Sequence, residues 1–215
     1  MPGFRLKNGR SEYMKAIVFI DVQNDFLKGG PLGFGYPAED NLPKIVGFAE
    51  KCAADPECRL YATRDTHVAD HVDVYDNRRF YEDRVTPEAI PYSMTLEGQK
   101  LPVPHCIEGQ PGWRIADSLM KVLDGRCTFV NKPTFGSFDL ADIIEEDVGF
   151  NGLRLDEIVL VGYCTSICVL ANAVILRAKF PNTKISVMGD LCGCVSEESH
   201  RRALEAMKMQ QIEIE

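Results

Sequence analysis

The sequence predicts a single α/β domain with three layers, in which helices cover both faces of a mostly parallel sheet of about six strands. Short apolar runs rich in β-branched residues recur along the chain without polar alternation, as expected for strands that are buried on both faces. Stretches with helical character separate these runs, and this alternation is typical of doubly wound folds. A length of 215 residues suits one domain, and the sequence contains no internal repeat or linker.

Each predicted element is bounded by polar, glycine or capping residues. The predicted strands lie at 16–20, 59–64, 127–130, 157–161 and 184–188, with an edge strand at 211–214. The predicted helices lie at about 41–54, 113–123, 138–147, 166–180 and 197–209. Ser196 precedes the last helix and suits the N-cap position.

Two segments fall outside this alternation. Residues 1–14 are polar, so we expect them to be an N-terminal extension to a domain spanning 15–215, with Met14 as an alternative start. The stretch of about 70–112 shows little periodicity and is long for a connection. Loops of this length are usually functional, and we therefore expect an active-site or lid loop there.

The charge balance excludes several classes of partner. The chain carries 32 Asp and Glu against 24 Lys and Arg, a formal net charge of -8, with no basic block. Such a chain is poorly suited to bind nucleic acid or an anionic membrane. It has no apolar run long enough to span a bilayer, and its start lacks the apolar segment of a signal peptide. We therefore expect a cytoplasmic protein whose 8 cysteines are mostly reduced.

Reactive side chains follow several of the predicted strands, where ligands bind in open α/β sheets. Asp21 ends the first strand, Lys132 ends the third, and Cys168 lies near the start of the helix that follows the fourth. Each has a plainer interpretation: an aspartate that caps a turn, a solvent-exposed lysine, and a buried helix cysteine. Their joint occurrence at strand ends favours a shared catalytic crevice.

Cys168 is the predicted nucleophile. A helix N-terminus and a nearby lysine both stabilise a thiolate, so we expect a lowered pKa for this thiol, with Thr165 or Ser166 capping the helix. A metal-binding pair of Cys164 and Cys168 is an alternative, although no second pair accompanies it.

The histidines form a second candidate cluster. Asp65 and His67 alternate around one residue, so at a strand end both side chains point the same way. His71 follows His67 at helical spacing, and His105 lies in a proline-rich turn. A carboxylate with imidazoles suits zinc, iron or manganese; the alternative is a set of surface histidines in a polar loop. His200 lies apart, on the last helix, and is expected to be a surface or packing residue.

Four motifs follow one another along the chain: 20–26 (IDVQNDF), 64–67 (RDTH) with 105–112 (HCIEGQPG), 131–138 (NKPTFGSF) and 162–169 (GYCTSICV). In this order they resemble the motifs of the isochorismatase-like cysteine hydrolases, a superfamily that includes nicotinamidases. The similarity covers about 15–214, nearly the whole predicted domain, and is closest to the nicotinamidase branch.

The resemblance implies the catalytic machinery. It implies a triad of Asp21, Lys132 and Cys168, and a cis peptide bond between Tyr163 and Cys164. The backbone amides of Cys164 and Cys168 would then form an oxyanion hole.

The resemblance also implies a metal site and a substrate site. The implied ligands are Asp65, His67 and His105, with His71 as a weaker fourth, around a divalent ion that is zinc, or alternatively iron or manganese. Gln23 and Phe26 are the implied substrate-binding residues.

The implied activity is cysteine-dependent hydrolysis of nicotinamide to nicotinate and ammonia through a thioester. Another small-amide or carbamoyl hydrolase is the main alternative, and a non-catalytic binding or structural domain is the other. Family members are often homo-oligomers.

The chain departs from the family pattern at three places. Ser166 stands where the family often has aspartate, and Val68 replaces an aromatic residue. Residues 72–95 resemble an insertion that could form a lid over a small-molecule pocket.

Overall fold

The structure is a computed structural model that describes residues 6–7, 10–11, 13–37, 40–67 and 104–215. Its centre is a 6-stranded sheet with the order β5-β4-β3-β6-β7-β8, in which every neighbouring pair is parallel. The strands are β3 (Tyr13–Ile20), β4 (Cys58–Asp65), β5 (Cys127–Lys132), β6 (Arg154–Tyr163), β7 (Lys184–Gly193) and β8 (Glu213–Ile214). The predicted fold class is thus confirmed, and the sheet is wholly parallel.

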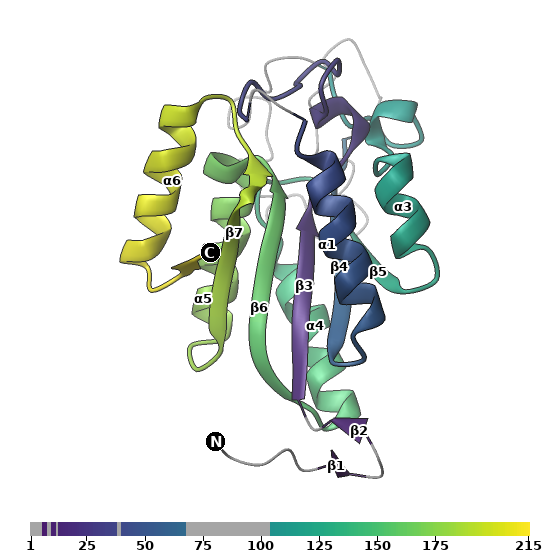
Figure 1. Ribbon diagram of the computed structural model, residues 1–215, viewed down its shortest axis with the longest axis vertical. Coiled ribbons are helices and arrows are strands. Elements are labelled where there is room, and N and C mark those ends of the chain that lie inside the picture. Colours follow the sequence, from purple (N-terminus) through teal and green to yellow (C-terminus); the bar gives the residue numbers. More distant parts are fainter. Residues whose placement is uncertain (1–5, 8–9, 12, 38–39, 68–103) are drawn as a thin grey trace, which may run out of the picture.

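Helices cover both faces of this sheet (Figure 1). One face carries α1 (Leu42–Ala54) and α3 (Asp117–Leu123), and the other carries α4 (Phe138–Asn151), α5 (Leu170–Lys179) and α6 (Glu197–Met209). Among the residues that the structure describes, no helix is both long enough and apolar enough to cross a lipid bilayer.

Two apolar cores lie between the sheet and its helices, one on each face of the sheet. Successive side chains of a strand point to opposite faces, and in β3 the residues Val18 and Ile20 enter one core while Ile17 and Phe19 enter the other. Because both faces of β3 need apolar side chains, its sequence lacks polar alternation.

Several boundaries differ from the predicted ones. β3 begins at Tyr13, inside the expected extension, and β1 (Leu6–Lys7) pairs with β2 (Arg10–Ser11) as a small antiparallel sheet. The helix expected at 113–123 begins only at Asp117, since Pro111–Trp113 forms a short 3-10 turn. α6 spans its predicted range, and the Ser196 hydroxyl accepts a hydrogen bond from the Ser199 amide at 3.2 Å, which confirms the N-cap.

The strand order locates the functional edge of the sheet. The chain runs outward from β3 through β4 to β5, then returns to pair β6 on the other side of β3. Ligands bind at such a switch point, beyond the carboxyl ends of the strands. The insertion expected at 72–95 and His71 lie outside the described residues, whereas 104–112 is described and lies beside this edge through a bridge between His67 and Ile107.

Candidate active site

Asp21 is the first residue beyond β3, and its side chain is fully buried. Its backbone adopts φ +49, a left-handed conformation that aspartate tolerates better than most residues. The Thr63 hydroxyl donates to Asp21 Oδ1 at 2.6 Å and accepts from the Asp21 amide at 3.1 Å. Burial raises the pKa of Asp21 above its ordinary value, against the opposing charge of Lys132.

Lys132 ends β5, and its side chain is buried rather than exposed to solvent. Its Nζ lies 2.6 Å from Asp21 Oδ2 and 3.8 Å from Asp65 Oδ1, and it donates to the Thr134 carbonyl at 3.1 Å. Burial alone would lower the pKa of Lys132, but the negative groups of Asp21, Cys168 and Asp65 raise it above its ordinary value. The lysine is therefore retained as an ammonium between two carboxylates.

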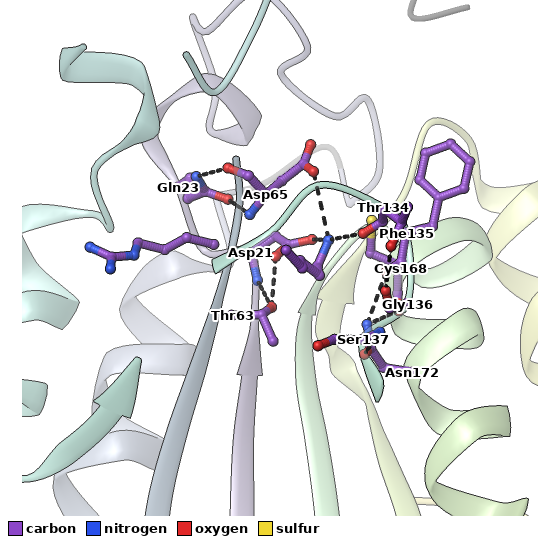
Figure 2. A network of polar contacts seen from close by, with 12 residues as sticks. Asp21, Gln23, Thr63, Asp65, Thr134, Phe135, Gly136, Ser137, Cys168 and Asn172 are labelled. Atoms are coloured by element: carbon purple, nitrogen blue, oxygen red, sulfur yellow. Dashed lines mark hydrogen bonds and ion pairs between the residues drawn. The ribbon is translucent and has the colours of Figure 1, made fainter. Parts of the chain in front are cut away.

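Cys168 lies within a π-helical turn, Thr165–Val169, between β6 and α5. The side chain of Asn172, one turn later, donates to the Cys168 carbonyl at 2.8 Å and to the Phe135 carbonyl at 3.0 Å. Asn172 also accepts from the Ser137 amide at 3.0 Å, so it joins the nucleophile segment to the segment that follows β5. Asp21, Asp65 and Cys168 lie together at the carboxyl ends of the strands (Figure 2).

The prediction that the Cys168 thiol has a lowered pKa is wrong. Burial raises the pKa of its thiol well above the ordinary value; Lys132 lowers the pKa, while Asp21 raises it further. Desolvation thus outweighs the helix terminus and the lysine. The predicted cap is also absent: Thr165 donates instead to the Gly193 carbonyl at 3.0 Å and contacts His200 Nδ1 at 2.9 Å.

The peptide bond between Tyr163 and Cys164 is cis, as the resemblance implied. It is preceded by Gly162 at φ +121, where an added Cβ would lie 2.1 Å from the Ile20 carbonyl oxygen. Only glycine fits this close approach of β6 to β3.

Asp65, His67 and His105 converge into a buried group beside the ion pair. Asp65 Oδ2 lies 3.0 Å from His67 Nε2 and 3.2 Å from His105 Nε2, and one ligand atom from each residue lies within 4.8 Å of the others. Burial would raise the pKa of Asp65, but Lys132 and the two histidines lower it overall. Two imidazoles with a carboxylate fit a divalent transition metal, so these three residues could hold one. Among the described residues this is the only such candidate group, and it contains neither Cys164 nor Cys168.

The side chain of Gln23 holds the backbone of this site in place. Its Nε2 donates to the Asp65 carbonyl at 2.9 Å and to the Trp113 carbonyl at 2.8 Å, while its Oε1 accepts from the Asp65 amide at 2.7 Å. Its predicted contact with substrate stays a prediction. Phe26, the other predicted substrate residue, is buried with its ring centroid 5.5 Å from that of His105.

The sequence reasoning missed several residues that position the site. Thr63 holds Asp21, Asn172 holds Cys168, and the Asp25 carboxylate accepts from the Cys106 amide at 2.6 Å, beside His105. Two of them could have been found from the sequence pattern, because Thr63 lies on the same face of β4 as Asp65 and Asn172 follows Cys168 at helical spacing.

His200 packs against Tyr36, with ring centroids 4.9 Å apart, which confirms the prediction that it is a packing residue.

Comparisons with known proteins identify the family of the chain. A family model described as the isochorismatase domain matches residues 15–214. The nicotinamidase/pyrazinamidase of Mycobacterium tuberculosis is 29% identical over 206 residues, covering 94% of this chain and 98% of that protein. The nicotinamidase of Schizosaccharomyces pombe is 26% identical over 212 residues, covering 93% of this chain and 91% of that protein.

Solved structures show the same fold. A nicotinamidase/pyrazinamidase from Bacillus subtilis superposes with a TM-score of 0.70 at 24% identity, and a pyrazinamidase from Pyrococcus horikoshii, solved in complex with zinc, with a TM-score of 0.68 at 23% identity. Each comparison covers 94% of this chain and 98% of the other. Because the domain model matches nearly the whole chain, this chain belongs to the isochorismatase family, and with its curated relatives this identifies it as an amidase hydrolase.

Proposed function

We propose that the protein hydrolyses nicotinamide to nicotinate and ammonia through a thioester on Cys168. The observation that carries this proposal is the buried ion pair of Asp21 and Lys132, which interacts with Cys168 beside the carboxylate and histidine group. The curated relatives named as nicotinamidases support the choice of substrate.

The first half of the reaction forms the thioester. The Cys168 sulfur attacks the amide carbon while its proton passes to Asp21, whose raised pKa suits it to hold that proton. The C–N bond then breaks, and Asp21 gives the proton to the leaving nitrogen, which departs as ammonia. Lys132 keeps the site electrically balanced, because its ammonium faces whichever of Asp21 and Cys168 carries the negative charge.

The second half regenerates the enzyme. Asp21 takes a proton from water, the oxygen attacks the thioester carbon, and the acid leaves as the Cys168 thiol is restored. The backbone amides of Cys164 and Cys168 are the proposed donors to the tetrahedral oxyanion, where one good donor contributes about 3 kcal/mol.

Asp65, His67 and His105 would hold the divalent metal, for which zinc is our proposal. A metal bound there would supply a Lewis-acidic position for the ring nitrogen of the substrate. Phe26, beside His105, would pack against the pyridine ring.

Ammonia release from nicotinamide tests the proposal. The wild-type protein supplied with zinc should release ammonia, and Cys168→Ala should lose at least about 1,000-fold in turnover, as expected for a nucleophile. Cys192→Ala is the matched control, since Cys192 is also a buried cysteine but has no place in the proposed chemistry. Absence of ammonia with the wild type, or full activity in Cys168→Ala, would overturn the proposal; activity only on other amides or carbamoyl compounds in a panel would point to the alternative hydrolase.

A further inference from the structure

Two thiols that the proposed chemistry does not use lie close together. Cys164 Sγ lies 3.4 Å from Cys194 Sγ and donates a hydrogen bond to it, although the two residues are 30 positions apart. Both thiols are buried, at 2% and 0% exposure, and both are unoxidised. The Ser166 hydroxyl contacts both sulfurs, at 3.5 Å from Cys164 and 3.3 Å from Cys194.

The main chain holds these two sulfurs close together. Cys194 directly follows β7, and its backbone exchanges hydrogen bonds with Tyr36, at 2.7 Å from the Cys194 amide and 2.9 Å to its carbonyl. Cys164 directly follows β6, the strand that pairs with β7, and precedes the π-helical turn that begins at Thr165. Since both backbones belong to ordered parts of the sheet edge, the approach of the sulfurs is built into the fold.

We propose that Cys164 and Cys194 form a disulfide when the protein meets a hydroperoxide, and that this pair is a modification site separate from the nucleophile Cys168. The Cys194 sulfur attacks the peroxide, the O–O bond breaks, and a sulfenic acid and water form. The Cys164 sulfur then attacks the sulfenic sulfur and displaces a second water. In total the two thiols lose two hydrogens, and one hydrogen peroxide is reduced to two waters.

The order of the two steps follows from the hydrogen bonding. The Cys164 thiol donates to the Cys194 sulfur, which lowers the pKa of Cys194 and raises that of Cys164. Cys194 is therefore the better initial nucleophile, and Cys164 is already in place to resolve it.

Residues that adjoin the pair reach the surface. Ser166, whose hydroxyl contacts both sulfurs, is half-buried, and Val195, which follows Cys194 in the chain, is 54% exposed. Because the sulfurs themselves are buried, the proposal concerns a small oxidant such as hydrogen peroxide.

Peptide mapping after treatment with hydrogen peroxide tests this inference. Trypsin leaves Cys164 and Cys168 together on peptide 155–177, and Cys192 and Cys194 together on peptide 185–201. In the double variant Cys168→Ala/Cys192→Ala, a cross-link between these peptides can involve only Cys164 and Cys194. We expect the linked peptide pair, lighter by two hydrogens than its parts, in the wild type and in the double variant, and its disappearance on reduction with dithiothreitol.

Adding Cys194→Ser to the double variant is the control and should abolish the cross-link. Circular dichroism before treatment establishes that each variant is folded. The inference is wrong if the folded double variant keeps both thiols available for alkylation after unfolding, or gives only sulfenic or sulfinic acid on one cysteine.

A second readout concerns activity and rests on the proposed function. Closing the sulfurs from 3.4 Å to about 2.05 Å shifts Cys164, whose amide is a proposed oxyanion donor. A displacement near 1 Å costs on the order of 100-fold in rate, so peroxide should lower wild-type turnover reversibly, and Cys194→Ser should resist the reversible part. The mass measurement stands without this assay, so failure of the nicotinamidase proposal and failure of the disulfide are distinguishable.

Discussion

The Nζ atom of Lys132 lies 2.6 Å from Oδ2 of Asp21, although β5 and β3 are separated in the sheet by β4. The lysine reaches across the end of the intervening strand, where it also faces Asp65 at 3.8 Å. A single buried cation thus joins the proposed acid–base group to the proposed metal ligands. The electrostatics of both parts of the site depend on this one side chain.

Replacing Lys132 with methionine should destabilise the protein strongly. Removal of one partner from a buried ion pair leaves the other uncompensated, at a cost of about 3–5 kcal/mol, which urea unfolding would measure. Lys179→Met is the matched control, because Lys179 pairs with Asp142 and Glu145 at the surface and its loss should change stability little. Equal losses in the two variants would contradict the importance of the buried pair.

Thr63→Val should weaken the site through Asp21. The variant keeps the shape of the side chain but removes the donor to the carboxylate and the acceptor for the Asp21 amide. We expect a loss of about 1.5–3 kcal/mol in the free energy of unfolding, with a fall in turnover. Thr128→Val, at an exposed position of β5, should leave both nearly unchanged; a similar effect there would remove the specific role of Thr63.

Gln23→Ala should reduce metal affinity without removing a ligand. Gln23 holds both the amide and the carbonyl of Asp65, and loss of such supporting contacts typically lowers metal affinity about 10- to 100-fold. Zinc titration of the metal-free protein by calorimetry would measure this change. Asn24→Ala is the control, since its side chain donates to the Pro111 carbonyl at 2.9 Å rather than to a proposed metal ligand. An unchanged zinc affinity in Gln23→Ala would show that Asp65 does not need this support.

Gly162→Ala should be poorly tolerated. Its φ of +121 disfavours any side chain, and the new Cβ would meet the Ile20 carbonyl oxygen, so a loss of at least about 2 kcal/mol is expected on thermal or urea unfolding. Gly149→Ala, within α4 and facing open space, should instead stabilise the protein by about 0.5–1 kcal/mol. A tolerated Gly162→Ala would show that β6 can move away from β3.

His200 should make stability depend on pH. Burial lowers the pKa of His200 in the folded protein, against smaller opposing effects of Cys194, Asp190 and Glu197. The unfolded chain therefore binds this proton more readily, and the contribution to stability is present above the unfolded pKa near 6.5 and is lost as pH falls below it. Between about pH 8 and about pH 5.5, wild type should lose more stability than His200→Gln in urea unfolding. Parallel losses in the two proteins would exclude His200 as a source of the effect.

Much of the architecture was predictable from local pattern. The unbroken apolar runs of β3 and β6 indicated burial on both faces, and Ser196 indicated the start of α6, because each of these signals lies within a few residues of the chain. The same reasoning misplaced the start of α3, where Pro111–Trp113 forms a separate turn. It also missed the π-helical turn before α5.

By itself, the sequence determined the chemical composition of the site: an aspartate, a lysine and a cysteine at strand ends, and a carboxylate with histidines nearby. Only the tertiary structure decided in which direction their pKa values shift. Burial raises the pKa of Cys168 where its helix position predicted the reverse, because desolvation depends on everything packed around the thiol. The contact between Cys164 and Cys194 likewise follows from the pairing of distant strands, which no local spacing reveals.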